Sequence, residues 1–489
     1  MPRPELSPLP LPLLLFLPLL LLMTGFPTTV TGVVKVLPRL PKRDRIQYLT
    51  PPPKADKDFV NDLKSALKDD IINSRWAEET LPVGSARAVA EFEPMGGVLI
   101  AYPGTQQVPG GQNPPVAPRS FGIPDTLVVS LQQLDRDPPV HIFILADLTI
   151  SETEWLLERL RKTASSMKTR LDTSLIHFVP WDTDTYWTRD YGPWWIQELD
   201  GNYNVVKHTY TTLGGGKVGT LFRPNDDYAT IKLLDFLNHP IQEYNKKTSL
   251  SIPISTDYFL GLLDVGGNYM VNGNGTAAST LLIGYQNLIP GGNLNNTITR
   301  IRQTYRDFLG ITEHHLLADP TGTYIGHIDC WAKFLSAKKI LIGESTNGTI
   351  RAKQNKIAQI FEAKGFEVLR LETPQNVPTQ DPIQGSNTTD APYVNSLILN
   401  NHVYVPLVNV SGFESFDENA LKVYEKALGD GYTVVGVPGK EDPHDWLGTD
   451  SLHCRTRGIP QPVVDNYLAA VNGLKNIKLA DSQTQSCNL

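Results

Sequence analysis

The chain has 489 residues, of which 40% are hydrophobic and 19% are charged, and its net charge is −7. This composition is typical of a globular protein with one large domain or two to three small ones, and it excludes a largely disordered chain. The negative charge offers no basic field to a polyanion, so we expect no nucleic-acid partner and favour a cationic substrate. Three cysteines are too few for a disulfide framework, and at least one must be unpaired.

The N-terminus has the pattern of a secretory signal. Arg3 precedes an apolar run over 11–23, which prolines interrupt and which is shorter than the ~20 residues that a spanning helix needs. We therefore expect cleavage near residues 30–32, a secreted extracellular protein and no stable membrane anchor after cleavage. Glycosylation in that compartment is compatible with sequons at Asn274, Asn295, Asn347, Asn387 and Asn409.

The rest of the chain divides by composition. A Pro-rich, basic stretch over 33–54 is typical of a linker, and apolar residues recur every four positions over 59–71, which predicts an amphipathic helix. The expected segments are a signal peptide over 1–32, a linker and N-terminal helix over 33–90, a main domain over 91–476 and a tail over 477–489.

From about residue 92 the predicted elements alternate. GVLIAYPG at 97 and VHIFILAD at 140 are predicted strands with a helical stretch around Ser130 between them, and Ser151 and Glu154 form a capping box for the helix TEWLLERLRK. LIHFVPWD predicts a further strand. Three later segments repeat strand, helix, strand: LLIGYQN at 281 to HHLLADP at 314, ILIGEST at 340 to VLRLETP at 368, and VYVPLVN at 403 to TVVGVPG at 433.

A unit of about 60 residues therefore recurs, and one copy cannot bury its apolar face alone. The units should close on themselves or stack, and closure would bring Asp190, His327 and Cys454 to one mouth. An open parallel sheet is the alternative, but no G-x-G-x-x-G or G-x-x-x-x-G-K-[ST] motif gives it a nucleotide site. The Gly-rich stretch over 266–276 is interpreted as a tight turn between strands.

GTDSLHCRTRGIP places Cys454 beside a histidine and a basic run. A thiol attacks as thiolate, whose pKa must be lowered locally, and His453, Arg455 and Arg457 are the nearest candidate cations. The alternative is a buried, inert cysteine.

Two further motifs carry acids and a histidine. WTRDYGPWW surrounds Asp190 with aromatic residues, which favours strong charge interactions; the alternative is an exposed acid paired with Arg189. His327 and Asp329 stand two apart, so on a strand both would face one side, and Cys330, which would face the other, is interpreted as structural.

Other uses of these residue types fit less well. No C-x-x-C, H-x-x-x-H or Asp-rich loop with ligand spacing occurs, so we expect neither a metal nor an organic cofactor. A cysteine protease also needs Cys and His, but its cysteine usually comes early in the chain, at a helix start.

The motifs WTRDYGPWW, GGNYMVNGNGT, YIGHIDCWAKFL, PYVNSLILNNHVYVP and GTDSLHCRTRGIP together resemble the bacterial-type (Porphyromonas-type) peptidylarginine deiminases, relatives of the agmatine deiminases. They occur in the family's order over about residues 90–475. The resemblance implies an α/β fold, the five-bladed, pseudo-fivefold propeller called the pentein fold, with the catalytic domain over 91–476.

The resemblance also implies roles. Cys454 would be the nucleophile, His327 the general acid and base, and Asp190 and Asp329 the carboxylates that hold a guanidinium. The matching substrate-binding positions are Trp187, Tyr324, Ile325, Asn395 and Thr449. Arg223 matches one of two arginines that hold the carboxylate of a C-terminal arginine; the position two before it is Leu221 here.

The implied reaction is hydrolysis of arginine side chains, in arginine-containing peptides or proteins, to citrulline and ammonia through a covalent thiouronium. Paired hydrogen bonds from the guanidinium to two carboxylates would fix its central carbon in front of the sulfur. The alternatives are an agmatine or free-arginine deiminase, an amidinotransferase, and a secreted binding module that has lost activity.

Overall fold

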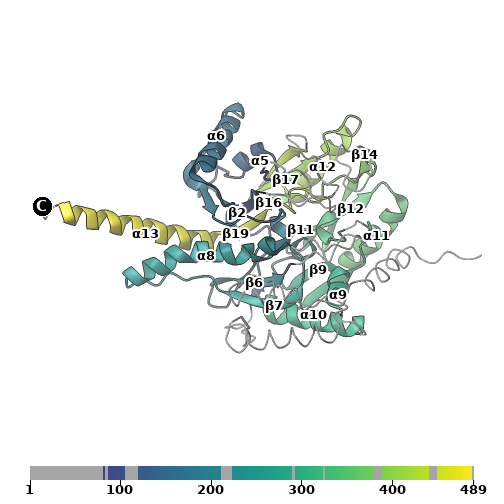
Figure 1. Ribbon diagram of the computed structural model, residues 1–489. Coiled ribbons are helices and arrows are strands. Elements are labelled where there is room, and N and C mark those ends of the chain that lie inside the picture. The colour runs from purple at the N-terminus through teal and green to yellow at the C-terminus, as the bar shows by residue number, and fades with distance from the viewer. Residues whose placement is uncertain are drawn as a thin grey trace, which may run out of the picture.

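The computed structural model describes residues 81–82, 86–104, 119–210, 223–288, 292–322, 325–378, 388–439, 446 and 449–486 (Figure 1). The expected signal peptide, linker and amphipathic N-terminal helix lie outside these residues. Within the described ranges, no helix is both long enough and apolar enough to cross a membrane.

Five sheets of three or four strands form the body of the described chain, beside one two-stranded pair, β14 (Val377–Pro378) with β15 (Thr388–Thr389). The first two sheets are β19 (Arg457–Pro460), β2 (Met95–Ala101), β3 (His141–Leu145) and β4 (Ile176–Val179), and β1 (Arg87–Ala88), β5 (Trp194–Gln197), β6 (Tyr203–Thr209) and β7 (Asp257–Leu263). The other three are β8 (Met270–Val271), β9 (Thr276–Thr280) and β10 (Glu313–Leu317); β11 (Ala332–Ser336), β12 (Lys339–Ser345) and β13 (Glu367–Thr373); and β16 (Leu397–Leu399), β17 (His402–Leu407) and β18 (Thr433–Pro438).

The five sheets share one pairing pattern. In each, a strand runs antiparallel to a middle strand, and the middle strand runs parallel to the next strand along the chain. A helical crossover joins the two parallel strands, as parallel pairing requires. The repeated strand-helix-strand unit predicted from the sequence is therefore the β-α-β crossover, and each sheet adds an antiparallel strand to it.

The crossover helices lie at the periphery of the molecule, around the sheets (Figure 1). They are α5 (Asp125–Ser130), α8 (Pro224–Lys247), α9 (Leu282–Gln286), α10 (Leu294–Leu309), α11 (Gly348–Ala363) and α12 (Glu414–Leu428). Helix α6 (Ile150–Ser166) connects β3 to β4, and α13 (Gln461–Ser486) packs on α8, where a Cβ on Gly473 would lie 2.2 Å from the ring of Tyr244.

The two ends of the described body meet in one sheet. Arg457 pairs with Leu99 and Gly458 with Val98, so β19 completes the sheet that β2 begins. The body extends past the boundaries expected from the sequence, because β1 precedes residue 91 and α13 continues beyond residue 476. Both differences arise from tertiary pairing, which composition does not record.

Two local predictions differ from the structure. Helix α6 begins two residues earlier than expected, because Thr149 and Glu152 form the capping box in place of Ser151 and Glu154. Within LLIGYQN, LIGYQ forms the helix α9, and the strand is the preceding TAAST of β9. A short apolar run has no periodicity that separates a buried strand from a helix.

Candidate active site

The four candidate catalytic residues and Asn395 lie on connections between successive sheets. Asp190 is on α7 (Thr188–Tyr191), between β4 and β5. His327 and Asp329 flank Ile328 at the start of η3 (Ile328–Cys330), between β10 and β11. Asn395 precedes β16, and Cys454 lies between β18 and β19. The same position in the repeated unit thus supplies each of them.

Gly267 marks the point where the acids and the histidine meet. It lies in η2 (Gly266–Asn268), between β7 and β8, and a Cβ built on it would stand 2.8 Å from His327 Nδ1, 2.9 Å from Asp190 Oδ1 and 3.1 Å from Asp329 Oδ2. His327 Nδ1 itself is 3.9 Å from Asp190 Oδ1. Only glycine leaves room for these three side chains, so the interpretation of GGNYMVNGNGT as simply a turn was incomplete.

Cys454 completes this group, which we call the cysteine site: Cys454, His327, Asp190 and Asp329. Its Sγ lies 3.4 Å from Asp329 Oδ2, and all four residues are buried. Asn395 Nδ2 is 3.1 Å from Sγ, and Asn395 Oδ1 accepts from the backbone N–H groups of Ser451 and Cys454. Asn395, which was expected to bind substrate, thus holds the cysteine loop.

A chain of charged groups supports Asp329 from behind. Asp329 Oδ2 is 2.7 Å from His453 Nδ1, and His453 Nε2 is 3.0 Å from Glu91 Oε2. Glu91 also accepts from Lys333 Nζ at 2.7 Å and from the Ile398 N–H at 2.8 Å. Burial alone would raise the pKa of Asp329, but the hydrogen bond and charge of His453 outweigh it and lower that pKa.

Asp190 has weaker support, because the charge of Arg223 and a backbone hydrogen bond from Gly267 do not offset its burial. Burial, followed by the charges of Asp329 and Asp450, raises its pKa well above the ordinary range, and its Oδ1 has no hydrogen-bond partner among the described residues. Burial and the same neighbouring acids also raise the pKa of the Cys454 thiol. A positive charge placed here would lower both pKa values, so the electrostatics of the cysteine site suit a bound cation.

Burial lowers the pKa of His327, and the nearby acids, led by Asp329, offset this only in part. His327 and Asp329 do share one neighbourhood, as the sequence predicted. The reason differs, because residues 328–330 form a 3-10 turn and not a strand. Cys330 does not face fully away either: its Sγ lies 3.8 Å from Asp329 Oδ1.

The structure describes the positions of four other residues that were expected to bind substrate. Trp187 Nε1 donates to Asp450 Oδ2 at 2.5 Å, and the Arg223 guanidinium lies 4.7 Å from the Trp187 ring centroid. Thr449 is buried, and Ile325 packs against the cluster around β11 and β12. Tyr324 and Leu221 lie outside the described residues.

The cations expected to activate the thiol are used elsewhere. Arg455 pairs with Asp450 at 3.3 Å and lies over the Tyr186 ring, whereas Arg457 donates from Nε to the Pro193 carbonyl. His453 bonds to carboxylates. The thiol pKa is nevertheless raised, because burial and the neighbouring acids outweigh these cations.

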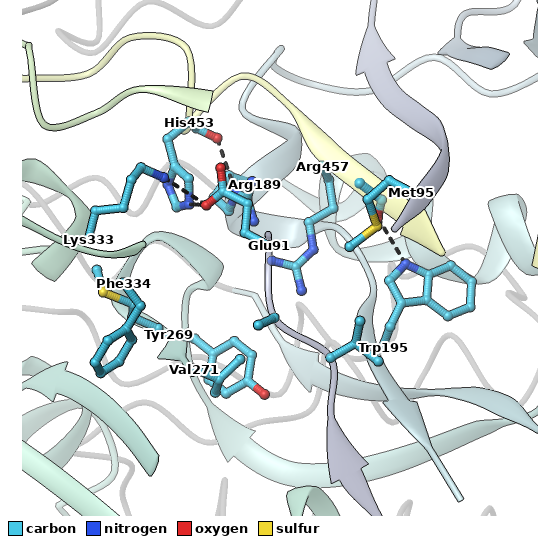
Figure 2. Close-up of a pocket in the computed structure, with 14 residues that line it drawn as sticks. Glu91, Met95, Arg189, Trp195, Tyr269, Val271, Lys333, Phe334, His453 and Arg457 are labelled. Carbon is cyan, nitrogen blue, oxygen red and sulfur yellow. Dashed lines mark hydrogen bonds and ion pairs between the residues drawn. The ribbon is translucent and has the colours of Figure 1, made fainter. Parts of the chain in front are cut away.

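Behind the cysteine site lies a second space, the rear cavity, of about 40 Å³ (Figure 2). Its ionisable lining comes from Glu91, Arg189, Lys333, His453 and Arg457, and Tyr269 adds a hydroxyl. Arg189 and His453 are the chain neighbours of Asp190 and Cys454, and the Arg189 N–H donates to the Cys454 carbonyl at 3.0 Å. One pair of backbone segments therefore separates the two spaces.

Sequence reasoning did not assign Glu91, Lys333, Asp450 or Gly267 to the site. Glu91 and Lys333 lie 242 positions apart, and no local pattern joins them. Asp450 had a signal, because it stands four residues before the cysteine. Among the described residues, no group of three or more histidines, cysteines and acids is placed to hold a metal ion.

Known proteins share this arrangement of elements. The model of the Porphyromonas-type peptidyl-arginine deiminase family matches residues 87–460. The agmatine deiminase of Pseudomonas fluorescens is 24% identical over 324 residues, which cover 60% of this chain and 80% of that protein.

Solved structures show the same fold. The agmatine deiminase of Enterococcus faecalis superposes with a TM-score of 0.51 at 19% identity, covering 77% of this chain and 98% of that one. The agmatine deiminase of C. jejuni gives a TM-score of 0.50 at 18% identity, covering 78% and 98%. The α/β fold is thus that of the pentein-type deiminases, and with most of its described body matched by the family model, the chain belongs to the Porphyromonas-type peptidyl-arginine deiminase family of guanidino-group hydrolases.

Proposed function

We propose that the chain hydrolyses a terminal guanidinium by covalent catalysis at Cys454. The observation that carries this proposal is the meeting of four side chains from three inter-sheet connections: His327, Asp190 and Asp329 surround Gly267, and Cys454 Sγ lies 3.4 Å from Asp329. Two carboxylates can accept the paired N–H groups of a planar guanidinium, and the sulfur then faces its central carbon.

The charges support the order of steps. In the empty site the Cys454 thiol holds its proton, because burial and three acids raise its pKa. A bound guanidinium would neutralise Asp190 and Asp329 and lower the thiol pKa, so substrate binding would itself generate the nucleophile. The thiolate would therefore form only when substrate is bound, and without substrate Cys454 would remain a thiol.

The reaction then has two steps, formation of a covalent thiouronium and its hydrolysis. The Cys454 thiol gives its proton to His327 as Sγ forms a bond to the guanidinium carbon. The C–N bond to the terminal nitrogen then breaks, and His327 passes that proton to this nitrogen, which leaves as ammonia. Water deprotonated by His327 attacks the resulting thiouronium, the C–S bond breaks and the thiol is regenerated. The products are a ureido compound and ammonia.

We also propose that the five sheets are blades of a closed, pseudo-fivefold propeller. Their common pairing pattern and the β19–β2 pairing between the two ends of the domain support this arrangement. In a ring of blades, the connections that carry Asp190, Gly267, His327, Asn395 and Cys454 would all face one central opening. That geometry explains why residues far apart in sequence meet.

For the substrate we propose first a small alkylguanidine of the agmatine class. The curated relatives matched over about four-fifths of their length are named agmatine deiminases, and so are the solved structures compared above. This order reverses our expectation from the sequence, in which peptidyl-arginine came first.

Peptidyl-arginine with a free carboxylate is the second candidate, and one residue favours it. Arg223 is buried over Trp187, donates from Nη1 to Tyr210 and keeps an unpaired Nε among the described residues. A buried guanidinium at this place would attract a substrate carboxylate and repel the amine of agmatine. The two candidates thus differ in the charge at the far end of the substrate.

The Cys454→Ala protein tests the nucleophile. It should bind agmatine or arginyl peptide in calorimetry yet release no ammonia, while Cys330→Ala, the matched change in the other described cysteine, keeps turnover. Undiminished ammonia release by Cys454→Ala would refute the mechanism.

A substrate panel tests the specificity. Relative kcat/KM should be measured for agmatine, free arginine, a peptide with C-terminal arginine and a peptide with a blocked internal arginine, in wild type and Arg223→Met. A preference for the C-terminal peptide that Arg223→Met abolishes would replace agmatine with the second candidate. Capture of the amidino group by an added amine would identify an amidinotransferase, and indifference of Cys454 to a haloacetamidine reagent would favour an inactive binding module.

Finally, we propose that the protein is secreted and glycosylated. Support comes from the N-terminal pattern and from the exposure of Asn274, Asn295, Asn347 and Asn409; Asn387 lies outside the described residues. When the chain is expressed in a secreting eukaryotic host, the culture medium should contain a protein that starts after residues 30–32. This protein should lose mass on glycosidase treatment. Retention of the intact chain inside the cells would contradict this proposal.

A further inference from the structure

The rear cavity holds more positive than negative charge. Arg189, Arg457 and Lys333 face it, against the single carboxylate of Glu91 (Figure 2). Both oxygens of Glu91 are already occupied, Oε1 by the Ile398 N–H and Oε2 by Lys333 Nζ and His453 Nε2. Glu91 therefore acts on the two arginines through its charge, without a direct ion pair among the described residues.

The two arginines lack acidic partners in the described part of the chain. Arg189 is 3% exposed, donates from Nε to the His453 carbonyl at 3.1 Å, and its Nη2 is buried without a hydrogen-bond partner there. Arg457 is 7% exposed and donates from Nε to the Pro193 carbonyl at 2.7 Å. Neither forms an ion pair with a described carboxylate, so the two buried guanidinium charges share the more distant charge of Glu91, which Lys333 and His453 already contact.

A third donor faces the same space. The Tyr269 hydroxyl is buried and has no partner among the described residues. Figure 2 shows the Arg457 guanidinium projecting into the region between Arg189 and Tyr269. Burial and the charge of Arg189 lower the pKa of Arg457 to about 9, which agrees with two like charges that share a confined space.

We propose that the rear cavity is a binding site for one small monovalent inorganic anion of halide size, held by Arg189, Arg457 and Tyr269. The remaining wall is apolar, with Val89, Met95, Trp195, Met270, Val271 and Phe334. A volume of about 40 Å³ accommodates such an ion or a few waters. Waters satisfy the donors but leave the charge uncompensated, so an anion is favoured over water alone.

The site would support the nucleophile indirectly. Arg189 donates its backbone N–H to the Cys454 carbonyl and its Nε to the His453 carbonyl. An anion that fixes the Arg189 side chain therefore also fixes the loop on which Cys454 lies. Because binding is measured on the folded protein without substrate, this proposal stands or falls independently of the deiminase activity.

Bromide is the probe for a direct test. Crystals soaked in sodium bromide should give an anomalous peak within hydrogen-bond distance of Arg189 Nη2 and Arg457, and crystals of Arg457→Met should give none. A rear cavity that contains only water after the same soak would overturn the proposal.

Thermal unfolding supplies a second readout. At constant ionic strength, replacing sodium gluconate by sodium bromide should raise the melting temperature of the wild type by about 2 °C or more at saturation. The increment should vanish in Arg457→Met and persist in Arg306→Met, an exposed arginine on α10.

Tyr269→Phe keeps both charges and removes one hydroxyl, so it serves if Arg457→Met folds poorly. It should weaken bromide binding by about tenfold or less. An equal increment in wild type, Arg457→Met and Tyr269→Phe would show a general salt effect and contradict the site.

Discussion

The cysteine site and the rear cavity lie on opposite sides of the same backbone segments and carry opposite charge. Asp190 and Cys454 belong to the first, whereas their neighbours Arg189 and His453 line the second. The two sides are linked by Asp329, which touches Cys454 on one side and His453 on the other.

The comparison shows two ways of keeping a buried carboxylate. Asp329 receives a hydrogen bond from His453, and its pKa is lowered despite burial. Asp190 Oδ1 receives no hydrogen bond from a described residue, and the pKa of Asp190 is raised. The supported acid is fixed by the fold, whereas the unsupported acid is left to be neutralised by the substrate. Four predictions follow this contrast from the largest effect to the smallest.

Removing Glu91 should break the support chain behind Asp329. Glu91→Gln leaves Lys333 without its carboxylate, so we expect a loss of about 3–5 kcal/mol in the free energy of unfolding at neutral pH. Burial would raise the pKa of Glu91, but Lys333, His453 and Arg189 hold it well below its usual value. Its stabilisation is present above the unfolded pKa and is lost as pH falls, so the difference from wild type should vanish in acid.

Denaturant unfolding across pH measures this effect. Glu313→Gln is the control, because Glu313 pairs with Lys364 at the surface and should contribute less than about 1 kcal/mol. Equal losses of unfolding free energy in the two variants would show that the buried ion pairs of Glu91 contribute no more stability than a surface pair.

Neutralising the two aspartates should change stability in opposite directions. Asp329→Asn removes the acceptor of His453 and should cost about 3 kcal/mol. Asp190 has a raised pKa, so the folded state binds its proton more tightly than the unfolded chain, and its contribution falls as pH rises through the folded pKa. At neutral pH Asp190→Asn should therefore raise the melting temperature, by about 2 °C.

Both variants should lose activity, since each removes one guanidinium acceptor. Calorimetric melting beside ammonia release separates the two effects. Destabilisation by Asp190→Asn would contradict the view that this acid is unsupported before substrate binds.

Adding one methyl group at Gly267 should disrupt the cysteine site. The Cβ of Gly267→Ala would stand under 3.0 Å from His327 Nδ1 and Asp190 Oδ1, so both side chains must move. A displacement of about 1 Å costs on the order of a hundredfold in rate. Gly348→Ala, in the first turn of α11 with open space around it, is the control. Full activity of Gly267→Ala would exclude the proposed geometry.

The smallest expected effect concerns Trp187. Trp187→Phe removes the hydrogen bond to Asp450 but keeps an aromatic ring beneath Arg223, so kcat/KM should fall by about tenfold. Trp155→Phe, on the exposed face of α6, should leave kcat/KM unchanged. A loss shared by both variants would point to general destabilisation.

Much of the secondary structure was predictable, because it depends on local patterns. β12, α11 and β13 coincide with the predicted strand, helix and strand of their segment, since alternating apolar runs and amphipathic periodicity are readable without tertiary context. The predictions failed at LLIGYQ and at residues 328–330, where short segments are buried on all sides and their pattern has no period. The four residues of the cysteine site were likewise named from motifs in the chain.

The sequence by itself determined the repeated unit, the residue types available for guanidine chemistry and the order of the motifs, because each depends on neighbours within a few positions. Only the tertiary structure decided that Gly267 leaves room for His327 and two acids, that Asn395 holds the cysteine loop, and that Arg457 faces a cavity and not the thiol. These outcomes depend on which faces of distant connections are packed together, and packing over hundreds of residues is set by the sum of many contacts that no single motif contains.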